Sequence, residues 1–294
     1  MNNSRVTPAD KLIGWYEKNG RTIAWRNPET SAWGILLSEV MSQQTPVTRV
    51  EPLWLEWIDR WPTPAALASA SNADVLRAWH NLGYPRRALR LKQAAEAMVQ
   101  RHGGEVPSTV DELLALPGIG DYTARAVAAF AYGQAVPVVD TNVRRVIARW
   151  IHGRLLAGPA RKADLEDAAA LLPQREAATF SVAVMELGAL VCAKQPHCEH
   201  CPIVDDCTWQ RLGCPQPQEE EVRAAARRVQ KFEGTDRQVR GKIMAVLRAS
   251  ESPVALKEID LVWPDAAQRS RALFSLIEDG LAIQTDPGHL SLPA

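Results

Sequence analysis

Apolar residues recur at intervals of three and four positions along most of the first 210 residues. This spacing places apolar side chains on one face of a helix and polar side chains on the other. It predicts helices over seven segments: Trp33–Ser42, Ala73–Trp79, Arg86–Arg101, Val110–Ala115, Tyr122–Tyr132, Val143–Ile151 and Asp164–Leu172. Glycine and proline residues separate these segments and mark turns. No stretch before residue 280 alternates clearly between apolar and polar residues, and we expect the first 210 residues to be all-α.

The pattern changes at the segment CPQPQEEE, which spans Cys214–Glu221 and contains no large apolar residue. We expect a linker over residues 213–235, which includes the basic stretch Arg223–Lys231. A separate small unit over residues 236–294 follows, with helices expected near Arg237–Ala249, Leu256–Val262 and Gln268–Asp279. Two short apolar runs around Asp286-Pro287-Gly288 predict a hairpin. Three helices and a hairpin indicate a winged-helix-like unit that binds DNA or protein; a unit that only packs against the rest of the chain fits equally well.

The composition limits the possible functions. The 294 residues are enough for two domains, and 46% of them are apolar, so a buried core can form. Lys and Arg together number 34, as do Asp and Glu, so any surface that attracts nucleic acid must be local. No run of 18 apolar residues occurs, and the start MNNSRVTPADK lacks the apolar core of a secretion signal. We therefore expect a cytoplasmic protein that does not enter membranes.

All the cysteines of the chain lie in one short segment. A disulfide scaffold would spread its cysteines along the chain, so this clustering indicates a metal site. The spacing is Cys192-x5-Cys198-x2-Cys201-x5-Cys207, with Cys214 beyond it and with His197 and His200 inside it. Four thiolates at this spacing suit a [4Fe–4S] cluster or a structural zinc, and the two histidines are rival zinc ligands. We expect the fifth cysteine to remain without a metal.

The segment LPGIG, Leu116–Gly120, places two glycines directly before an expected helix. Glycine allows positive φ and a close approach of the backbone, and a helix N-terminus attracts phosphate. A plain turn between two helices is the alternative.

Two carboxylates are candidates for catalysis. Asp140 follows an apolar run in VPVVDTNV and precedes a helix, where it would cap the helix or act on a substrate. Glu39 lies in the apolar helical segment LLSEVMSQQT, and burial of an acid raises its pKa, so that it can act as a general acid. An exposed Glu39 paired with an arginine is the alternative interpretation.

Together the LPGIG hairpin, the helix after it, the PVVDTNV loop and the cysteines resemble the helix-hairpin-helix DNA glycosylases with a Gly/Pro…Asp loop. This superfamily includes endonuclease III and the A/G-specific adenine glycosylases of the MutY type. The resemblance covers about residues 8–212 and implies an all-α, two-lobed fold with an iron–sulfur cluster loop. One helical domain would span residues 28–138 and a second would combine residues 1–27 and 139–212. The bound cofactor would be a [4Fe–4S] cluster on Cys192, Cys198, Cys201 and Cys207, with a monovalent cation at the hairpin.

The segment SEVMSQQT resembles the MutY-type segment that carries the catalytic glutamate. By this resemblance Glu39 protonates adenine at N7, and Asp140 stabilises the positively charged sugar. Bifunctional relatives carry a lysine nucleophile two residues after the second hairpin glycine, where this chain has Tyr122. We therefore expect water to be the nucleophile and the enzyme to be monofunctional.

The resemblance also implies a set of DNA contacts. Gln44, together with Gln43, would insert into the duplex where the base leaves, and Tyr84 in NLGYPRRALRL would wedge beside 8-oxoguanine. The remaining candidates for contact with DNA or the base are Arg26 of WRNP, Arg86, Gly118, Gly120 and Asn142. The expected partner is double-stranded DNA with an A:8-oxoguanine or A:G mispair, bound by a monomer.

This chain departs from the family pattern in five places. The first cysteine gap is five residues where six is usual, Asn81 and Pro85 replace commoner residues, and Val182 stands where some adenine glycosylases have glutamate. The nudix-like C-terminal domain of MutY-type enzymes is absent from residues 236–294, whose pattern is different. Two alternatives stay open: a thymine or uracil glycosylase of the same superfamily, and a non-catalytic iron–sulfur protein that binds DNA.

Overall fold

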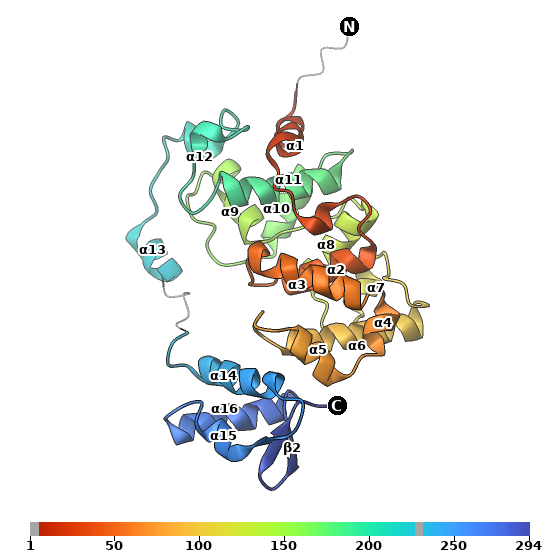
Figure 1. Cartoon of the computed structure of the whole chain (residues 1–294). Coiled ribbons are helices and arrows are strands. Elements are labelled where there is room, and N and C mark those ends of the chain that lie inside the picture. Colours follow the sequence, from red (N-terminus) through yellow and green to blue (C-terminus); the bar gives the residue numbers. More distant parts are fainter. Residues whose placement is uncertain (1–5, 227–231) are drawn as a thin grey trace. The chain divides into compact units, whose positions relative to one another are not determined.

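Short helices joined by tight turns make up most of the protein (Figure 1). The computed structural model describes residues 6–226 and 232–294, so residues 227–231 of the expected linker and basic stretch lie outside the described residues. Within the described part, no helix is both long and apolar enough to cross a membrane. The contacts of the chain define two compact units: residues 1–26, 108–111 and 120–229 form unit 1, and residues 27–107, 112–119 and 230–294 form unit 2.

The described part of unit 1 is helical and contains no strand. Its elements are α1 (Pro8–Asn19), η1 (Ala24–Arg26), α8 (Asp121–Tyr132), α9 (Thr141–Trp150), α10 (Ala163–Leu171), α11 (Ala177–Leu190), η2 (Cys198–His200), α12 (Thr208–Arg211) and α13 (Glu219–Ala226). α11 packs against α1 and α9 around buried Leu12, Phe180 and Leu187. Gly188 of α11 lets α9 approach, because a Cβ there would lie 2.7 Å from the Cβ of Asn142.

The first part of unit 2 is a group of helices around buried tryptophans. These helices are α2 (Ala32–Met41), α3 (Val47–Arg60), α4 (Pro64–Ala68), α5 (Asn72–Ala78) and α6 (Arg86–Arg101). The short helix α7 (Val110–Leu114) follows, and its residues are divided between the two units. The Trp57 ring packs edge to face against Trp61 and Trp79, with centroids 4.8 and 5.5 Å apart. The buried Trp57 indole also donates to the Ala78 carbonyl at 2.9 Å. Aromatic packing therefore accounts for much of this core.

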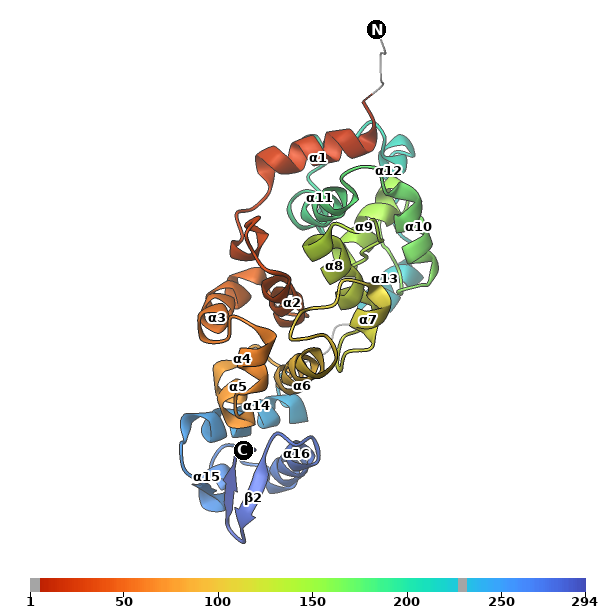
Figure 2. The ribbon, with the colours of Figure 1, turned by 90° about the vertical axis from the view of Figure 1, so that its right-hand side faces the viewer.

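The C-terminal part of unit 2 has the arrangement expected of a winged-helix-like unit. It consists of α14 (Asp236–Ala249), β1 (Val254–Ala255), α15 (Leu256–Asp260), α16 (Ala266–Glu278), β2 (Ile283–Asp286) and β3 (His289–Ser291). The strands form an antiparallel sheet in the order β1-β3-β2. Both ribbon views show α14 next to α5 (Figures 1 and 2), and Leu76 of α5 is fully buried in one core with residues of α14 and α16.

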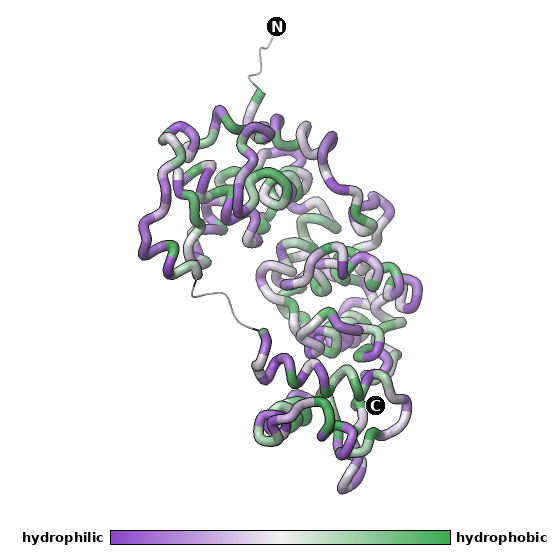
Figure 3. Tube along the Cα trace, turned by 60° about the vertical axis from the view of Figure 1, so that its left-hand side comes forward, coloured by the Kyte–Doolittle hydropathy of each residue, from purple (hydrophilic) through white to green (hydrophobic). Residues whose placement is uncertain are grey.

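The seven helices predicted for the first part of the chain are all present, with boundaries within two residues of the prediction. Purple and green alternate along most helices in the hydropathy view, which is the periodicity that predicted them (Figure 3). One prediction about local structure is wrong. Glu219–Ala226 of the expected linker form α13, because three glutamates favour its first turn. The strand at Val254–Ala255 lies beyond the 210 residues expected to be all-α, and it is too short to show alternation.

The compact units also differ from the expected domains. α8 groups with unit 1 rather than with residues 28–138, because its core residues Ala126 and Ala129 pack against Met185 of α11. The winged-helix-like unit is grouped with the helices of unit 2, and its standing as a separate domain stays a prediction.

Candidate active site and cysteine pocket

Glu39 lies on α2, near the end of that helix. The hydroxyl of Ser31 caps the helix by accepting from the Gly34 amide, and the neighbours Ser38 and Val40 are buried. Glu39 itself is half-buried rather than fully buried as the sequence suggested, because it faces the boundary between the core and solvent. The carboxyl group is therefore carried by an apolar helix on a residue that is not fully buried.

Two turns in unit 2 present exposed side chains from unusual backbone conformations. Gln44 follows α2 with a φ of 56°, and Tyr84 precedes α6 with a φ of 47°. A non-glycine residue with positive φ costs about 1 kcal/mol or more and is kept where the structure needs it. Tyr84 is 46% exposed. Gln43 is half-buried beside Gln44.

Arg87 fastens these two turns to each other. Its Nη1 donates to the carbonyls of Val40 and Gln43 at 2.7 and 2.8 Å, and its Nη2 donates to those of Leu82 and Gly83 at 3.2 and 3.1 Å. Burial lowers the pKa of the guanidinium to about 10, so Arg87 stays charged at neutral pH. The candidate Arg86 beside it instead pairs with Asp279 of the winged-helix-like unit at 2.9 Å. The role of Arg87 was not apparent from the sequence.

The LPGIG segment is a hairpin that turns its glycines outward. Leu116 and Ile119 are buried, whereas Gly118 and Gly120 are exposed. Gly118 has a φ of 77°, and a Cβ at that position would lie 2.7 Å from the Cβ of Arg90. Gly120 is the N-cap of α8, where a Cβ would meet nothing within 4 Å. The exposed amide groups at this helix start suit a phosphate.

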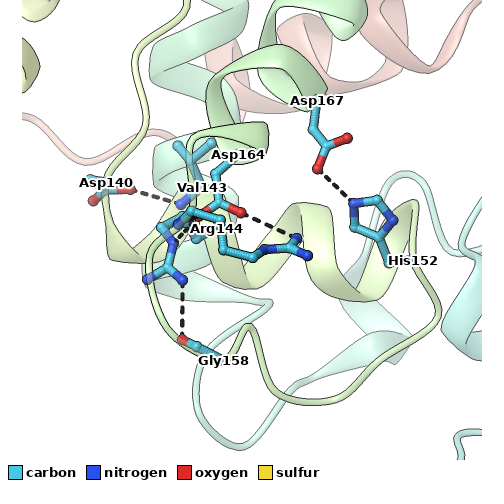
Figure 4. Close-up of polar contacts among 8 residues, drawn as sticks. Asp140, Val143, Arg144, His152, Gly158, Asp164 and Asp167 are labelled. Carbon is cyan, nitrogen blue, oxygen red and sulfur yellow. Dashed lines mark hydrogen bonds and ion pairs between the residues drawn. The ribbon is translucent and has the colours of Figure 1, made fainter.

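The carboxylate of Asp140 caps α9 in unit 1 (Figure 4). Its Oδ1 accepts from the Val143 amide at 2.7 Å, and its Oδ2 accepts from the Asn142 side chain at 2.9 Å. Burial raises the pKa of Asp140, although both hydrogen bonds oppose that effect. Arg144 of the same helix pairs with Asp164 at 2.7 Å and donates to the Gly158 carbonyl, which holds α9 in place. Asp140 is therefore both a cap and a fixed, partly buried carboxylate.

Asn142 belongs to a chain of contacts that leads from Asp140 to the cysteines. Its Oδ1 accepts from Arg145 at 2.7 Å. The Arg145 guanidinium also donates to the carbonyls of Gly188 at 2.6 Å and Cys192 at 2.8 Å. The orientation of the Asp140 loop thus depends on where the main chain runs at the first cysteine.

Four cysteines gather around one pocket in unit 1. The pocket and the solvent at its opening together occupy about 300 Å³. The residues that line it include Cys192, Cys198, Cys201, Cys207, Arg149 and Trp209. Burial raises the pKa of Cys201 to about 12 and raises that of Cys192 as well. Neutral thiols are therefore favoured until a cation replaces the protons. Arg149 donates to the Cys192 sulfur at 3.3 Å, which suits a site that gains negative charge.

The rival ligands and Cys214 do not line this pocket. The side chains of His197 and His200 are 60% and 74% exposed and lie near Glu199. Among the described residues, no group of three His, Cys, Asp or Glu side chains is placed to hold a single metal ion.

Two further candidates have structural contacts in unit 1. Arg26 pairs with Glu186 at 2.8 Å, and Arg21 pairs with the same carboxylate at 2.7 Å. The sequence did not indicate this buried pairing, because it joins residues that are 160 or more positions apart. Tyr122 is half-buried against Ala126 and Ala129. The roles expected of Arg26 and Tyr122 at the DNA stay predictions.

Known proteins with similar sequences are DNA repair glycosylases. The family model described as HhH-GPD superfamily base excision DNA repair protein matches residues 37–155. The adenine DNA glycosylase of Mycobacterium tuberculosis (strain CDC 1551 / Oshkosh) is 54% identical, over 96% of this chain and 92% of that protein. The human adenine DNA glycosylase is 37% identical over 67% of this chain and 38% of that protein.

Two solved structures share the fold. A thermostable thymine-DNA glycosylase aligns with a TM-score of 0.64 and 25% identity, covering 69% of this chain and 95% of that one. Endonuclease III in a non-covalent DNA complex aligns with a TM-score of 0.58 and 22% identity, covering 70% of this chain and 94% of that one. The sequence identity to the mycobacterial enzyme extends over nearly the whole of both chains, including the winged-helix-like unit. The chain therefore belongs to the adenine DNA glycosylases, within the HhH-GPD superfamily of base excision DNA repair proteins.

Proposed function

We propose that this chain removes adenine from A:8-oxoguanine and A:G mispairs by hydrolysis. The observation that carries the proposal is the carboxylate of Asp140, held by two hydrogen bonds and partly buried. The burial that raises its pKa also strengthens its attraction for a cation, because charges interact more strongly away from water. A positively charged, oxocarbenium-like sugar forms when the base leaves and the glycosidic bond breaks.

In this mechanism Glu39 donates its proton to N7 of the flipped adenine. The bond between C1′ and N9 then breaks, its electron pair goes to the base, and Asp140 stabilises the cationic sugar. A water oxygen adds to C1′, and its proton passes to a carboxylate, which leaves an abasic site. Tyr122 offers no amine at the position where bifunctional relatives carry lysine, so the strand stays intact.

The DNA contacts support base flipping. The outward-facing glycines 118 and 120 and the start of α8 would hold a phosphate, together with a monovalent cation at the hairpin. Extrusion of the adenine costs a few kcal/mol, which Gln44 would offset by filling the gap. Tyr84 would then pack beside the opposite base. We propose that the enzyme acts as a cytoplasmic monomer.

We also propose that the cysteine pocket holds a [4Fe–4S] cluster rather than zinc. All four thiols line the pocket, while the rival histidines are exposed outside it. A four-iron cluster binds each cysteine to a different iron, so its ligands need not converge on one atom as those of a zinc ion must. When bound, the cluster crosslinks the loop, and hydrolysis needs no electron from it.

Base release from short duplexes tests the function. Duplexes with A:8-oxoguanine, A:G, T:G and undamaged pairs would each be incubated with the enzyme and analysed with and without hot alkali. We expect cleavage at adenine only after alkali, and its loss in Glu39→Gln and Asp140→Asn. Glu56→Gln, an exposed residue of α3, is the matched control.

Other results of the same assay would contradict the proposal. Release of thymine from T:G would favour the alternative that this chain is a thymine glycosylase, like the solved thymine-DNA glycosylase of similar fold. Strand breakage without alkali would exclude water as the nucleophile. Binding without release of any base would indicate a non-catalytic protein.

A further inference from the structure

The winged-helix-like unit places a cation against the exposed ring of Tyr84. Arg237, in the first turn of α14, donates through Nη1 to the Tyr84 hydroxyl at 2.9 Å. Its guanidinium carbon lies 6.0 Å from the centre of the Tyr84 ring and 5.1 Å from that of Phe232. Two segments about 150 residues apart in sequence thus form one group of two aromatic rings around a cation. We refer to Tyr84, Phe232 and Arg237 as the Tyr84–Arg237 cluster.

The cluster is held firmly, because the winged-helix-like unit is docked at several points. Leu76 of α5 is fully buried against α14 and α16. Arg77 donates to the carbonyl of Ser250 at 3.0 Å, and Asn72 donates to the carbonyl of Ala294 at 2.9 Å. The position of Arg237 is therefore a property of the fold and not of one surface contact.

Several arginines lie close to the cluster on a chain whose net charge is zero. Asp279 pairs with both Arg86 and Arg240, at 2.9 and 2.6 Å, so two cations share one carboxylate. Within the described residues, the Arg237 side chain makes no ion pair, and its guanidinium donates a hydrogen bond to Tyr84 alone. The guanidinium thus keeps donors and charge for a further acceptor.

The exposure of the aromatic rings points to the same kind of partner. Tyr84 is 46% exposed and Phe232 is 50% exposed, and both flank a cation. Exposed aromatic rings beside arginine are the combination that packs on bases and tracks a phosphate backbone. Membrane or protein binding would call for a wider apolar surface than these two rings.

We propose that Arg237 binds a phosphate of the DNA strand that carries the base opposite the adenine, with Phe232 packing against that strand. This inference rests on the proposed function, which brings Tyr84 to that base. It makes the winged-helix-like unit part of the DNA-binding surface through the start of α14, not through its hairpin. A phosphate contact carries no sequence information, so Arg237 should strengthen binding to both mispairs alike.

The test is the affinity of full-length protein for duplexes that hold a non-cleavable adenosine analogue opposite 8-oxoguanine or guanine, measured over a range of salt. We expect Arg237→Met to weaken binding to both duplexes by roughly tenfold and to reduce the salt slope by about 1. Phe232→Ala should weaken binding without changing the slope. The matched control is Lys242→Met on the same helix, whose cation instead lies 5.0 Å from the Trp263 ring.

Tyr84→Phe separates a DNA contact from a purely structural role. That variant loses the hydroxyl that Arg237 holds but keeps the cation, so its salt slope should equal that of the wild type. The inference is overturned if Arg237→Met binds like Lys242→Met, or if Tyr84→Phe reproduces the whole effect of Arg237→Met. Loss of the proposed function would show separately, as failure of the wild type to release adenine from ordinary substrate.

Discussion

At the scale of single residues, Arg87 holds the turns of Gln44 and Tyr84 in position. Arg87→Met removes a donor from several carbonyls at once, so we expect the free energy of unfolding to fall by about 2 kcal/mol. Base release at saturating DNA should slow as both turns loosen. Arg87→Lys should recover only part of each loss, because an ammonium group cannot reach both turns with a planar fork.

Thermal melting and single-turnover base release measure these effects. Arg101→Met, exposed at the other end of α6, is the control. Identical behaviour of the Arg87 and Arg101 variants would show that the turns do not need this clamp.

Glu186 is a second residue whose environment gives a measurable consequence. Burial raises its pKa, but hydrogen bonds from Arg21 and Arg26 outweigh burial and bring it down to about 2. A carboxylate whose pKa is lowered in the folded state stabilises the protein fully when the pH is above the ordinary pKa of that group. This contribution is lost as the pH falls toward the lowered pKa. Glu186→Gln should therefore cost about 3 kcal/mol at neutral pH.

The difference in stability between wild type and Glu186→Gln should be constant above the ordinary pKa of about 4.5 and shrink as the pH approaches 2. Urea unfolding at a series of pH values measures it. Glu219→Gln, which breaks an exposed pair with Arg223, should show almost no effect at any pH. A gap that widens in acid would contradict the assigned sign.

At the scale of elements, the two hairpin glycines serve different purposes. Gly118→Ala forces a Cβ into positive φ and against Arg90, so we expect a loss of about 2 kcal/mol in the free energy of unfolding. Gly120→Ala adds a Cβ that meets only open space, at a φ of −98° that any residue adopts. That variant should melt like the wild type.

Binding to DNA distinguishes the two variants further. If the hairpin amides bind phosphate, the methyl group added by Gly120→Ala should keep the phosphate from approaching them closely, so affinity should fall about tenfold while stability is unchanged. Unchanged affinity in Gly120→Ala would favour the interpretation of LPGIG as a plain turn.

Periodicity predicted the helices well because each helix is a local structure with its own apolar face. The same reasoning could not find β1, which exists only because Val254 pairs with Leu290. Nor could it find the clamp of Arg87, whose partners at Val40 and Gln43 are main-chain carbonyls that any residue would present. The contact of Arg237 with Tyr84 joins positions 153 residues apart and leaves no local signal.

The candidate site was predictable to the extent that it follows local motifs. Asp140 lies at a helix start and the four cysteines surround one pocket, as their spacing suggested. The positive φ of Gln44 and Tyr84 was not predictable, because neither position is a glycine and tertiary contacts impose the conformation. Their expected roles at the DNA stay predictions.

At the scale of the whole molecule, the cysteine loop supports the catalytic loop through a chain of contacts. Arg145 joins Asn142, and thereby Asp140, to the Cys192 carbonyl. A bound cluster would fix the path of the main chain at that carbonyl, because it crosslinks four points within a short loop. Removing one ligand should therefore disturb Asp140 as well as the loop itself.

Cys198→Ser tests this dependence, since Cys198 lines the pocket while Cys214 does not. We expect the purified wild type to contain iron and acid-labile sulfide in equal amounts, and Cys198→Ser to lose most of both. Its base release should fall further than its DNA binding, because the loss reaches Asp140 through Arg145. Cys214→Ser should keep the cluster, the activity and the melting temperature. Zinc in place of iron would contradict the assignment of a [4Fe–4S] cluster to the pocket. Full activity in Cys198→Ser would contradict the structural role of the cluster, because a loop that holds its shape without the cluster needs no crosslink.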